Sequence, residues 1–181
     1  NKYRSETTRL PGWDYSWPAY YFVTICTKDR SNYFGRVEAG AVVLSEIGKI
    51  TQKYWVEIPE HFKNVCPDAF VIMPNHVHGI IIINPVIGRD VAYNVSTRNT
   101  TDPQKFMSDI SPKPGALGTI VRSFKSAVTR WCRKNDYKYF GWQCLYYDHI
   151  IRDVVSLWRI REYIRNNPRN WDKEKDRNYL R

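Results

Sequence analysis

Residues 76–83, with the sequence HVHGIIII, place two histidines one residue apart ahead of four consecutive isoleucines. β-Branched side chains favour a strand, and so apolar a run is typical of a strand buried in a sheet. Alternate residues of a strand point to the same face, so we expect His76 and His78 to stand side by side. Such a pair is a common half-site for a divalent metal ion, although two ligands alone hold a catalytic ion poorly. The alternative is a pair of histidines with ordinary structural or solvent contacts.

Around this strand, the remaining segments show strand and helix patterns in turn. Three more segments have the alternation and β-branched content of strands, namely 20–27 (YYFVTICT), 69–73 (AFVIM) and 142–148 (WQCLYYD). Three have apolar residues at helical spacing, namely 45–58, 117–134 and 152–167. The resulting order, β-α-β-β-α-β and then a helix, predicts an α+β fold of the ferredoxin-like (RRM-like) type. We expect a four-stranded antiparallel sheet with two helices on one face, and an added C-terminal helix, which carries a tyrosine, on the other.

The length of 181 residues suits one domain with a substantial core, so we expect a single domain over 1–181. Within it, residues 1–18 are polar and aromatic and predict an irregular N-terminal arm. Residues 84–116 lack periodicity and are rich in Pro, Asn, Ser, Thr and Asp, which is typical of a long loop. Residues 41–44 (AVVL) are expected to form one arm of a hairpin.

The composition favours a polyanionic partner. The chain has 28 Lys and Arg against 18 Asp and Glu, a formal net charge of +10, and an aromatic content of 15%. Cations can meet phosphates while aromatic rings stack on unstacked bases, so this combination suits nucleic acid. The alternative is that the aromatic residues fill the core and that the charge only keeps the protein soluble.

Composition also argues against some classes of protein. No apolar run reaches the roughly 18 residues that a bilayer-spanning helix needs, so no membrane partner is expected. The four cysteines form no CxxC pair, which argues against a zinc knuckle or ribbon. They are Cys26, Cys66, Cys132 and Cys144. Unpaired, scattered cysteines fit a reducing cytoplasm, where we expect the protein to reside.

The helix predicted over 152–167 carries a second group of polar residues. Tyr163 and Asn167 are four residues apart and are therefore neighbours on one face of a helix. An amide oxygen can complete the ligand shell of a hard metal ion, and a phenol beside it can attack a polarised phosphate. Arg159 and Arg165 lie on either side of the tyrosine in the sequence. The alternative is a surface helix with a packing tyrosine, and the helix by itself favours that alternative.

Four stretches together carry a family resemblance: FVIMPNHVHGIIII, SFKSAVTRW, WQCLYYDHIIRD and YIRNNPRNW. Over roughly residues 13–172 the chain resembles the single-tyrosine transposases of the HUH endonuclease superfamily, above all the REP-associated tyrosine transposases and their insertion-sequence relatives. MPNHVHG together with a later YI-x-N-N-P is far more specific than two histidines alone. The resemblance implies that His76 and His78 are metal ligands and that Tyr163 is the nucleophile. It also implies a third, polar ligand at Asn167, where many relatives carry Gln.

The resemblance implies a function as well, namely metal-dependent cleavage and rejoining of single-stranded DNA, a transposase activity. Mg²⁺ or Mn²⁺ would polarise the scissile phosphate. The Tyr163 oxygen would attack in line and leave a 5′-phosphotyrosine and a free 3′-OH, and the reverse attack would rejoin strands without ATP. The expected partner is single-stranded DNA that forms REP-like hairpins. A homodimer, in which the tyrosine helix serves a partner chain, is left open.

Further DNA contacts are expected from cations near these motifs. Arg122 and Lys125 on the 117–134 helix are candidates to meet phosphates, and the alternative is a solvated helix face. Arg159 and Arg165 complete the expected DNA-binding set. His149 is a candidate general base, for which a structural hydrogen bond is the alternative.

Two other functions compete with this interpretation. One is a ferredoxin-like module that binds RNA or single-stranded DNA without catalysis, for which aromatic residues on an exposed sheet would suffice. The other is a nuclease that uses metal-bound water. The pairing of His76 and His78 with a later tyrosine and amide argues against the first. The lack of a carboxylate-rich cluster near the motif argues against the second.

Overall fold

The computed structural model describes residues 9–85, 113 and 115–171. Residues 1–8 of the expected arm and most of the expected loop over 84–116 therefore lie outside the described residues. Within the described part of the chain, no helix is both long and apolar enough to cross a bilayer.

A four-stranded sheet forms the centre of the molecule. Its strands are β1 (Ala19–Cys26), β4 (Val65–Met73), β5 (His76–Ile83) and β6 (Tyr147–Ile151). They lie in the order β4-β5-β1-β6, and every neighbouring pair is antiparallel. This order places the first and third strands of the β-α-β-β-α-β series in the middle, as the ferredoxin-like pattern requires. The predicted fold class is confirmed.

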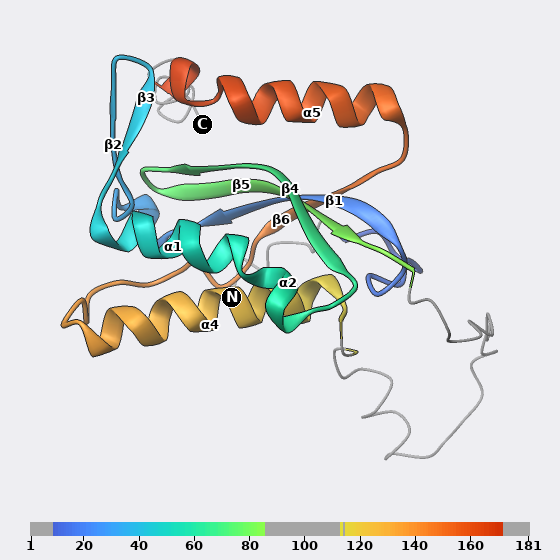
Figure 1. The fold of residues 1–181 in the computed structure, drawn as a ribbon, viewed down its shortest axis with the longest axis horizontal. Helices are drawn as coiled ribbons and strands as arrows, with labels where there is room; N and C mark the ends of the chain where they lie inside the picture. The colour runs from blue at the N-terminus through green and yellow to red at the C-terminus, as the bar shows by residue number, and fades with distance from the viewer. Residues whose placement is uncertain (1–8, 86–112, 114, 172–181) are drawn as a thin grey trace, which may run out of the picture.

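Helices cover both faces of this sheet, but not equally (Figure 1). On one face lie α1 (Glu46–Val56), the short α2 (Ile58–His61) and the long α4 (Leu117–Lys134). On the other face lies α5 (Val154–Asn166), followed by the 3₁₀ turn η2 (Pro168–Asn170). A second 3₁₀ turn, η1 (Lys28–Arg30), follows β1. The added helix thus packs on the face that α1 and α4 leave free.

Strand β5 is buried on both faces because its side chains alternate between two cores. Val77 and Ile81 point into the large core beneath α1 and α4, while Ile80 packs into a smaller core with α5. Gly79 is needed where α1 comes closest, because a Cβ there would lie 2.3 Å from Cζ2 of Trp55. The same alternation places His76 and His78 on the α5 face.

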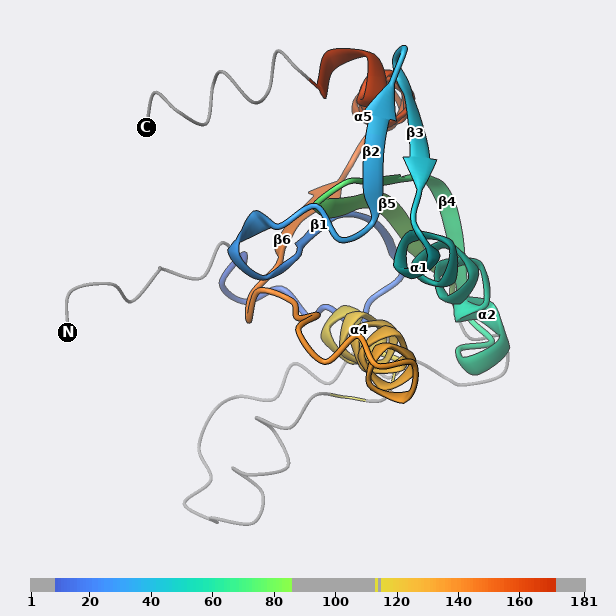
Figure 2. The same cartoon turned by 90° about the vertical axis from the view of Figure 1, so that its left-hand side faces the viewer.

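A small hairpin stands beside α5 (Figure 2). It consists of β2 (Gly35–Glu38) and β3 (Ala41–Leu44), as expected for residues 41–44. At its tip Gly40 has a φ of +75°, and a Cβ there would lie 3.3 Å from the Arg169 side chain after α5. The hairpin therefore abuts the end of α5.

Three element boundaries differ clearly from the predicted ones, and the first is that of β4, which begins at Val65 and not at residue 69. The last strand runs over Tyr147–Ile151 and not over 142–148, because the segment before it uses its backbone groups elsewhere. Gln143 N donates to Cys26 O, and the carbonyls of Gln143 and Cys144 accept from the Lys125 ammonium. The helix predicted over 45–58 is divided at Glu57, where Pro59 in the first turn of α2 starts a new helix.

Candidate metal and nucleophile site

The two histidines of β5 lie side by side beneath α5, as their spacing predicts. Both are buried, and their ring centroids are 4.3 Å apart. Cross-strand pairing places Cys26 opposite His76 and Thr24 opposite His78 on β1. The sheet register therefore determines which side chains can support each imidazole.

Hydrogen bonds orient both rings in the same sense. His76 Nδ1 donates to Oδ1 of Asn75 at 2.7 Å, and Asn75 Nδ2 in turn donates to Arg30 O, which settles the orientation of the amide. With the proton on Nδ1, the lone pair of His76 lies on Nε2, which is buried and has no hydrogen-bond partner among the described residues. His78 Nδ1 lies 2.8 Å from Oγ1 of Thr24. Both rings can thus turn Nε2 outward as a ligand atom.

The electrostatics keep both imidazoles neutral. Burial, with a smaller effect of the nearby Arg30 charge, lowers the pKa of His76 to about 4. Burial, together with the neighbouring His76, lowers the pKa of His78 well below its usual value. A neutral imidazole is the form that binds metal, so protons do not compete for these nitrogens at neutral pH.

Tyr163 meets this pair from α5. Its hydroxyl lies 3.2 Å from His78 Nε2, and its ring packs edge-on against His78 and Phe22. With the His78 proton on Nδ1, the hydroxyl donates to Nε2. Tyr163 is 43% exposed, so the residue is both oriented by the site and accessible from outside.

Two kinds of contact hold α5 in this position. Leu157, Ile160 and Ile164 pack onto the sheet in the smaller core. Arg161 forms an ion pair with Asp68 at 2.7 Å, and Asp68 lies in the register shift of β4. The helix begins at Val154, with Asp153 as its N-cap: the carboxylate accepts from Ser156 N.

The apolar sector of α5 is narrower than its periodicity suggests. Val154 and Trp158 belong to that sector by spacing, but they are 80% and 62% exposed. The contacts of α5 with the sheet are mainly with β4. A helix seated near one edge of a sheet buries only the side chains that point down onto it.

Asn167 lies at the C-cap of α5 and is buried. Tyr163, four residues before it, contacts His78, and Trp171, four residues after it, lies with its ring 6.0 Å from that of His76. The amide is thus held between two residues that touch the histidine pair. Asn167 was predicted as a ligand from the sequence and stays a prediction, whereas no sequence pattern pointed to Trp171, Thr24 or Asn75.

These donors fit a hard divalent ion with an incomplete protein shell. The two Nε2 atoms are candidate ligand atoms, that of His76 is buried without a hydrogen-bond partner among the described residues, and the buried Asn167 lies at the end of α5. No three His, Cys, Asp or Glu side chains among the described residues are grouped closely enough to hold a metal ion. A site here would therefore consist of two histidines, an amide and ligands from outside the chain.

The expected DNA-binding cations divide between the two faces of the molecule. Arg159 and Arg165 are exposed on α5, and Arg165 is paired with Glu162 at 2.9 Å. Arg122 and Lys125 lie on α4, across the sheet from Tyr163. Lys125 is half-buried and donates to two backbone carbonyls at 2.6 and 3.2 Å, so it also has a structural task. Burial lowers the pKa of its ammonium.

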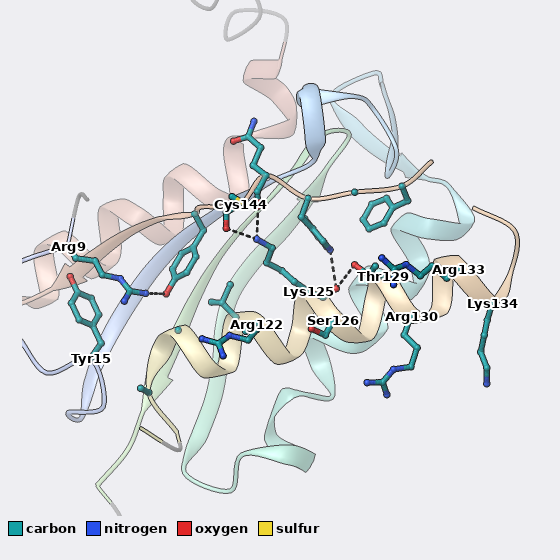
Figure 3. Close-up of a pocket in the computed structure, with 18 residues that line it drawn as sticks. Arg9, Tyr15, Arg122, Lys125, Ser126, Thr129, Arg130, Arg133, Lys134 and Cys144 are labelled. Atoms are coloured by element: carbon teal, nitrogen blue, oxygen red, sulfur yellow. Dashed lines mark hydrogen bonds between the residues drawn. The ribbon is translucent and has the colours of Figure 1, made fainter. Parts of the chain in front are cut away.

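Arg122 and Lys125 line a basic cavity of about 1120 Å³, which we call the α4 groove (Figure 3). It lies between α4, the segment before β6 and the N-terminal segment around Arg9. Its lining cations are Arg9, Arg122, Lys125, Arg130, Arg133 and Lys134. None of the described residues that line it is acidic. Arg9 is held in place by a hydrogen bond to the Tyr146 hydroxyl at 2.7 Å and by Asp148 at 3.7 Å.

No protein-family profile matches this chain, but a known protein is related to it in sequence. A protein of Haemophilus influenzae strain Rd, itself uncharacterized, is 40% identical over 169 residues, which cover 93% of this chain and 91% of that protein. This chain belongs to the same family as the Haemophilus protein.

Solved structures identify the fold. A REP-associated tyrosine transposase bound to a REP hairpin matches 90% of this chain and 73% of its own, with a TM-score of 0.56 and 15% identity. A candidate transposase of Deinococcus radiodurans R1 matches 88% of this chain and 97% of its own, with a TM-score of 0.39 and 14% identity. The first match shows that this chain has the fold of REP-associated tyrosine transposases, which confirms the resemblance at the level of the fold.

Proposed function

We propose that this protein processes single-stranded DNA as a transposase does, by cleaving and rejoining strands through a covalent bond to Tyr163. The observation that carries the proposal is the Tyr163 hydroxyl, 3.2 Å from a neutral, buried histidine that stands beside a second one. The fold shared with a REP-associated tyrosine transposase supports it. The net charge of +10 suits DNA as the substrate.

His76, His78 and Asn167 would hold Mg²⁺ or Mn²⁺ at this site. When bound, the ion supplies a Lewis acid that polarises the scissile phosphate and stabilises the charge that develops on it. Asn75 keeps the proton of His76 on Nδ1, and Thr24 Oγ1 engages Nδ1 of His78, so that each Nε2 would remain available. The Trp171 ring, 6.0 Å from the ring of the buried His76, would form one wall of this site.

The covalent step would be an exchange of one phosphate ester for another. The Tyr163 oxygen loses its proton and bonds to phosphorus, while the bond between phosphorus and the 3′ oxygen breaks. That 3′ oxygen takes up a proton and leaves as a 3′-OH, and a 5′-phosphotyrosine remains. Attack of a 3′-OH on this ester reverses the step, so rejoining needs no nucleotide cofactor.

The α4 groove would hold a second part of the same DNA. Its cations are suited to the closely spaced phosphates of a paired segment, and it lies across the sheet from Tyr163. We propose a hairpin-forming strand of the REP type as the substrate, with its paired stem at Arg122 and Lys125. The unpaired part would then reach the tyrosine, with Arg159 and Arg165 near its phosphates.

The test is formation of a covalent protein–DNA band with labelled hairpin-forming oligonucleotides and Mg²⁺. Wild-type protein should form the band, and Tyr163→Phe, which removes only the hydroxyl, should abolish it while DNA affinity persists. Tyr139→Phe, at an exposed tyrosine of the loop after α4, is the matched control and should keep the band.

Peptide mapping of the adduct identifies the attacking residue. A label on any tyrosine outside EYIRNNPR would refute the assignment. Binding without any adduct, with or without Mg²⁺ or Mn²⁺, would favour a binding module over an enzyme.

A further inference from the structure

The α5 face of the sheet is only partly covered. The smaller core joins α5 to β4 and β5 through Ala69, Val71, Ile80 and Ile82, and it also includes Phe22 of β1 and Ile151 at the end of β6. Before Ile151, β6 is open on this face: Tyr147 is 47% exposed, and His149 is exposed as well. These two residues of β6 point to the same face as Phe22 and His78, because the strand alternates.

The sheet register connects this open strip to the candidate site. Tyr147 stands opposite Thr24, and Thr24 stands opposite His78, so the three form one row across β6, β1 and β5. Adjacent strands are about 4.8 Å apart, so Tyr147 and His78 are about 10 Å apart along the row. A molecule that spans this row touches the exposed tyrosine at one end and a proposed metal ligand at the other.

Phe22, two residues from Thr24 on β1, connects the aromatic rings beside this row. The Phe22 ring is stacked near His78, with centroids 5.4 Å apart. Its centroid is 6.3 Å from that of Tyr147 and 6.2 Å from that of Tyr163, in edge-on contact with both. Phe22 itself is buried, so Tyr147 and Tyr163 are the accessible rings on either side of it.

Tyr147 differs in its surroundings from Tyr139, another exposed tyrosine. Tyr139 is more exposed, but its ring packs against Tyr33 and Tyr137. The Tyr147 hydroxyl makes no hydrogen bond within the described chain, and its ring touches only Phe22 among the aromatic residues described. An accessible ring on an edge strand, in line with the proposed metal ligands, is suited to stacking on an unpaired base.

We propose that Tyr147 is the stacking platform for the unpaired base next to the scissile phosphate. The proposal rests on the proposed function of the site. Stacking on this ring is the same before and during the attack, so it contributes to substrate binding and not to the chemical step. Loss of the ring should therefore raise KM and leave kcat nearly unchanged.

The first experiment measures initial rates of adduct formation for the full chain with single-stranded oligonucleotides and Mg²⁺. Tyr147→Ala should raise KM roughly 5- to 100-fold, the range expected for one stacked base, with kcat within about twofold. Tyr147→Phe should retain the wild-type KM, since only the ring is needed. Tyr139→Ala is the matched control and should change neither value.

The second experiment removes the base from the DNA. In the Tyr163→Phe protein, which binds without reacting, abasic sites on either side of the scissile phosphate should weaken binding at one position as much as Tyr147→Ala does. Combining that abasic site with Tyr147→Ala should weaken binding no further, because both remove the same interaction. This arm needs no cleavage, so it tests the stacking even if the wild-type protein forms no adduct.

The outcomes separate the two proposals. If the wild-type protein forms no adduct, the proposed function fails. If the adduct forms and Tyr147→Ala binds and reacts as the wild type does, the platform is refuted and the function stands. If the abasic site and Tyr147→Ala weaken DNA binding independently, so that their fold-losses of affinity multiply, the platform is also refuted.

Discussion

At the scale of single residues, the orientation of the imidazoles depends on two side chains outside the motif. Asn75 Oδ1 accepts a hydrogen bond from Nδ1 of His76, and Thr24 Oγ1 lies within hydrogen-bond distance of Nδ1 of His78. Neither would contact a metal ion directly. They are positioning residues, because a ring that flips or shifts its proton to Nε2 loses its ligand atom.

Thr24→Val should weaken binding of Mn²⁺ about 10- to 100-fold, because the isosteric side chain removes the oxygen opposite His78 Nδ1. Isothermal titration calorimetry measures the change. Thr119→Val, which removes a hydroxyl bonded to the carbonyl of Lys113, is the control and should bind the ion as the wild type does. Equal affinity in both variants would mean that Thr24 does not orient His78.

At the scale of elements, the site depends on how closely α1 and α5 sandwich strand β5. α5 is attached by its apolar face and by the ion pair between Arg161 and Asp68. On the opposite face, the Trp55 ring of α1 lies directly against the Gly79 backbone, one residue from His78. Packing below the strand therefore affects the position of the histidines above it.

Gly79→Ala should lower the free energy of unfolding by about 1–3 kcal/mol or more, because the new methyl group overlaps the buried Trp55 ring. Urea titration followed by circular dichroism measures this. Trp55→Phe in the same chain should recover part of the loss, since a smaller ring makes room for the methyl group. Gly141→Ala is the control: its Cβ would have only ordinary contacts, at 3.4 Å or more, and a small effect is expected. A Gly79→Ala protein as stable as the wild type would contradict the close approach.

At the scale of the whole molecule, the sheet separates two surfaces of different character. One face holds the two histidines, Tyr163 and the exposed Tyr147 of β6, and the other holds the α4 groove with its cations (Figures 1 and 3). Binding and chemistry should therefore respond to different substitutions.

Reversing charges in the groove should affect binding only. Arg122→Glu with Arg130→Glu should weaken binding of a hairpin oligonucleotide and reduce the slope of log affinity against log salt by about 1 for each phosphate that the groove no longer neutralises. The adduct rate at saturating DNA should remain that of the wild type. Lys49→Glu, at an exposed lysine of α1 outside the groove, is the control for charge alone. An unchanged salt slope in the double variant would exclude the groove as a DNA surface.

Local periodicity determined most of the elements and part of the site. A period of two predicts β5 and the adjacent placement of His76 and His78, and a period of 3.6 places Asn167 one turn after Tyr163. These relations depend on the geometry of one element alone, so the sequence is enough to predict them. The order of the elements was also enough to predict the ferredoxin-like sheet.

Only the tertiary structure determined the contacts between side chains of different elements. Tyr163 and His78 are 85 residues apart in the chain, and Thr24 and His78 are 54 apart, so their contacts depend on strand register and on where α5 is seated. Periodicity identifies the apolar sector of a helix but not how much of it a sheet edge will cover, which is why Trp158 is exposed. It likewise cannot show that a lysine such as Lys125 will meet carbonyls rather than solvent. The exposure of Trp158 and the contacts of Lys125 both follow from packing between segments that are distant in the chain. The free energy of burial in such packing comes from the whole core and not from any single element.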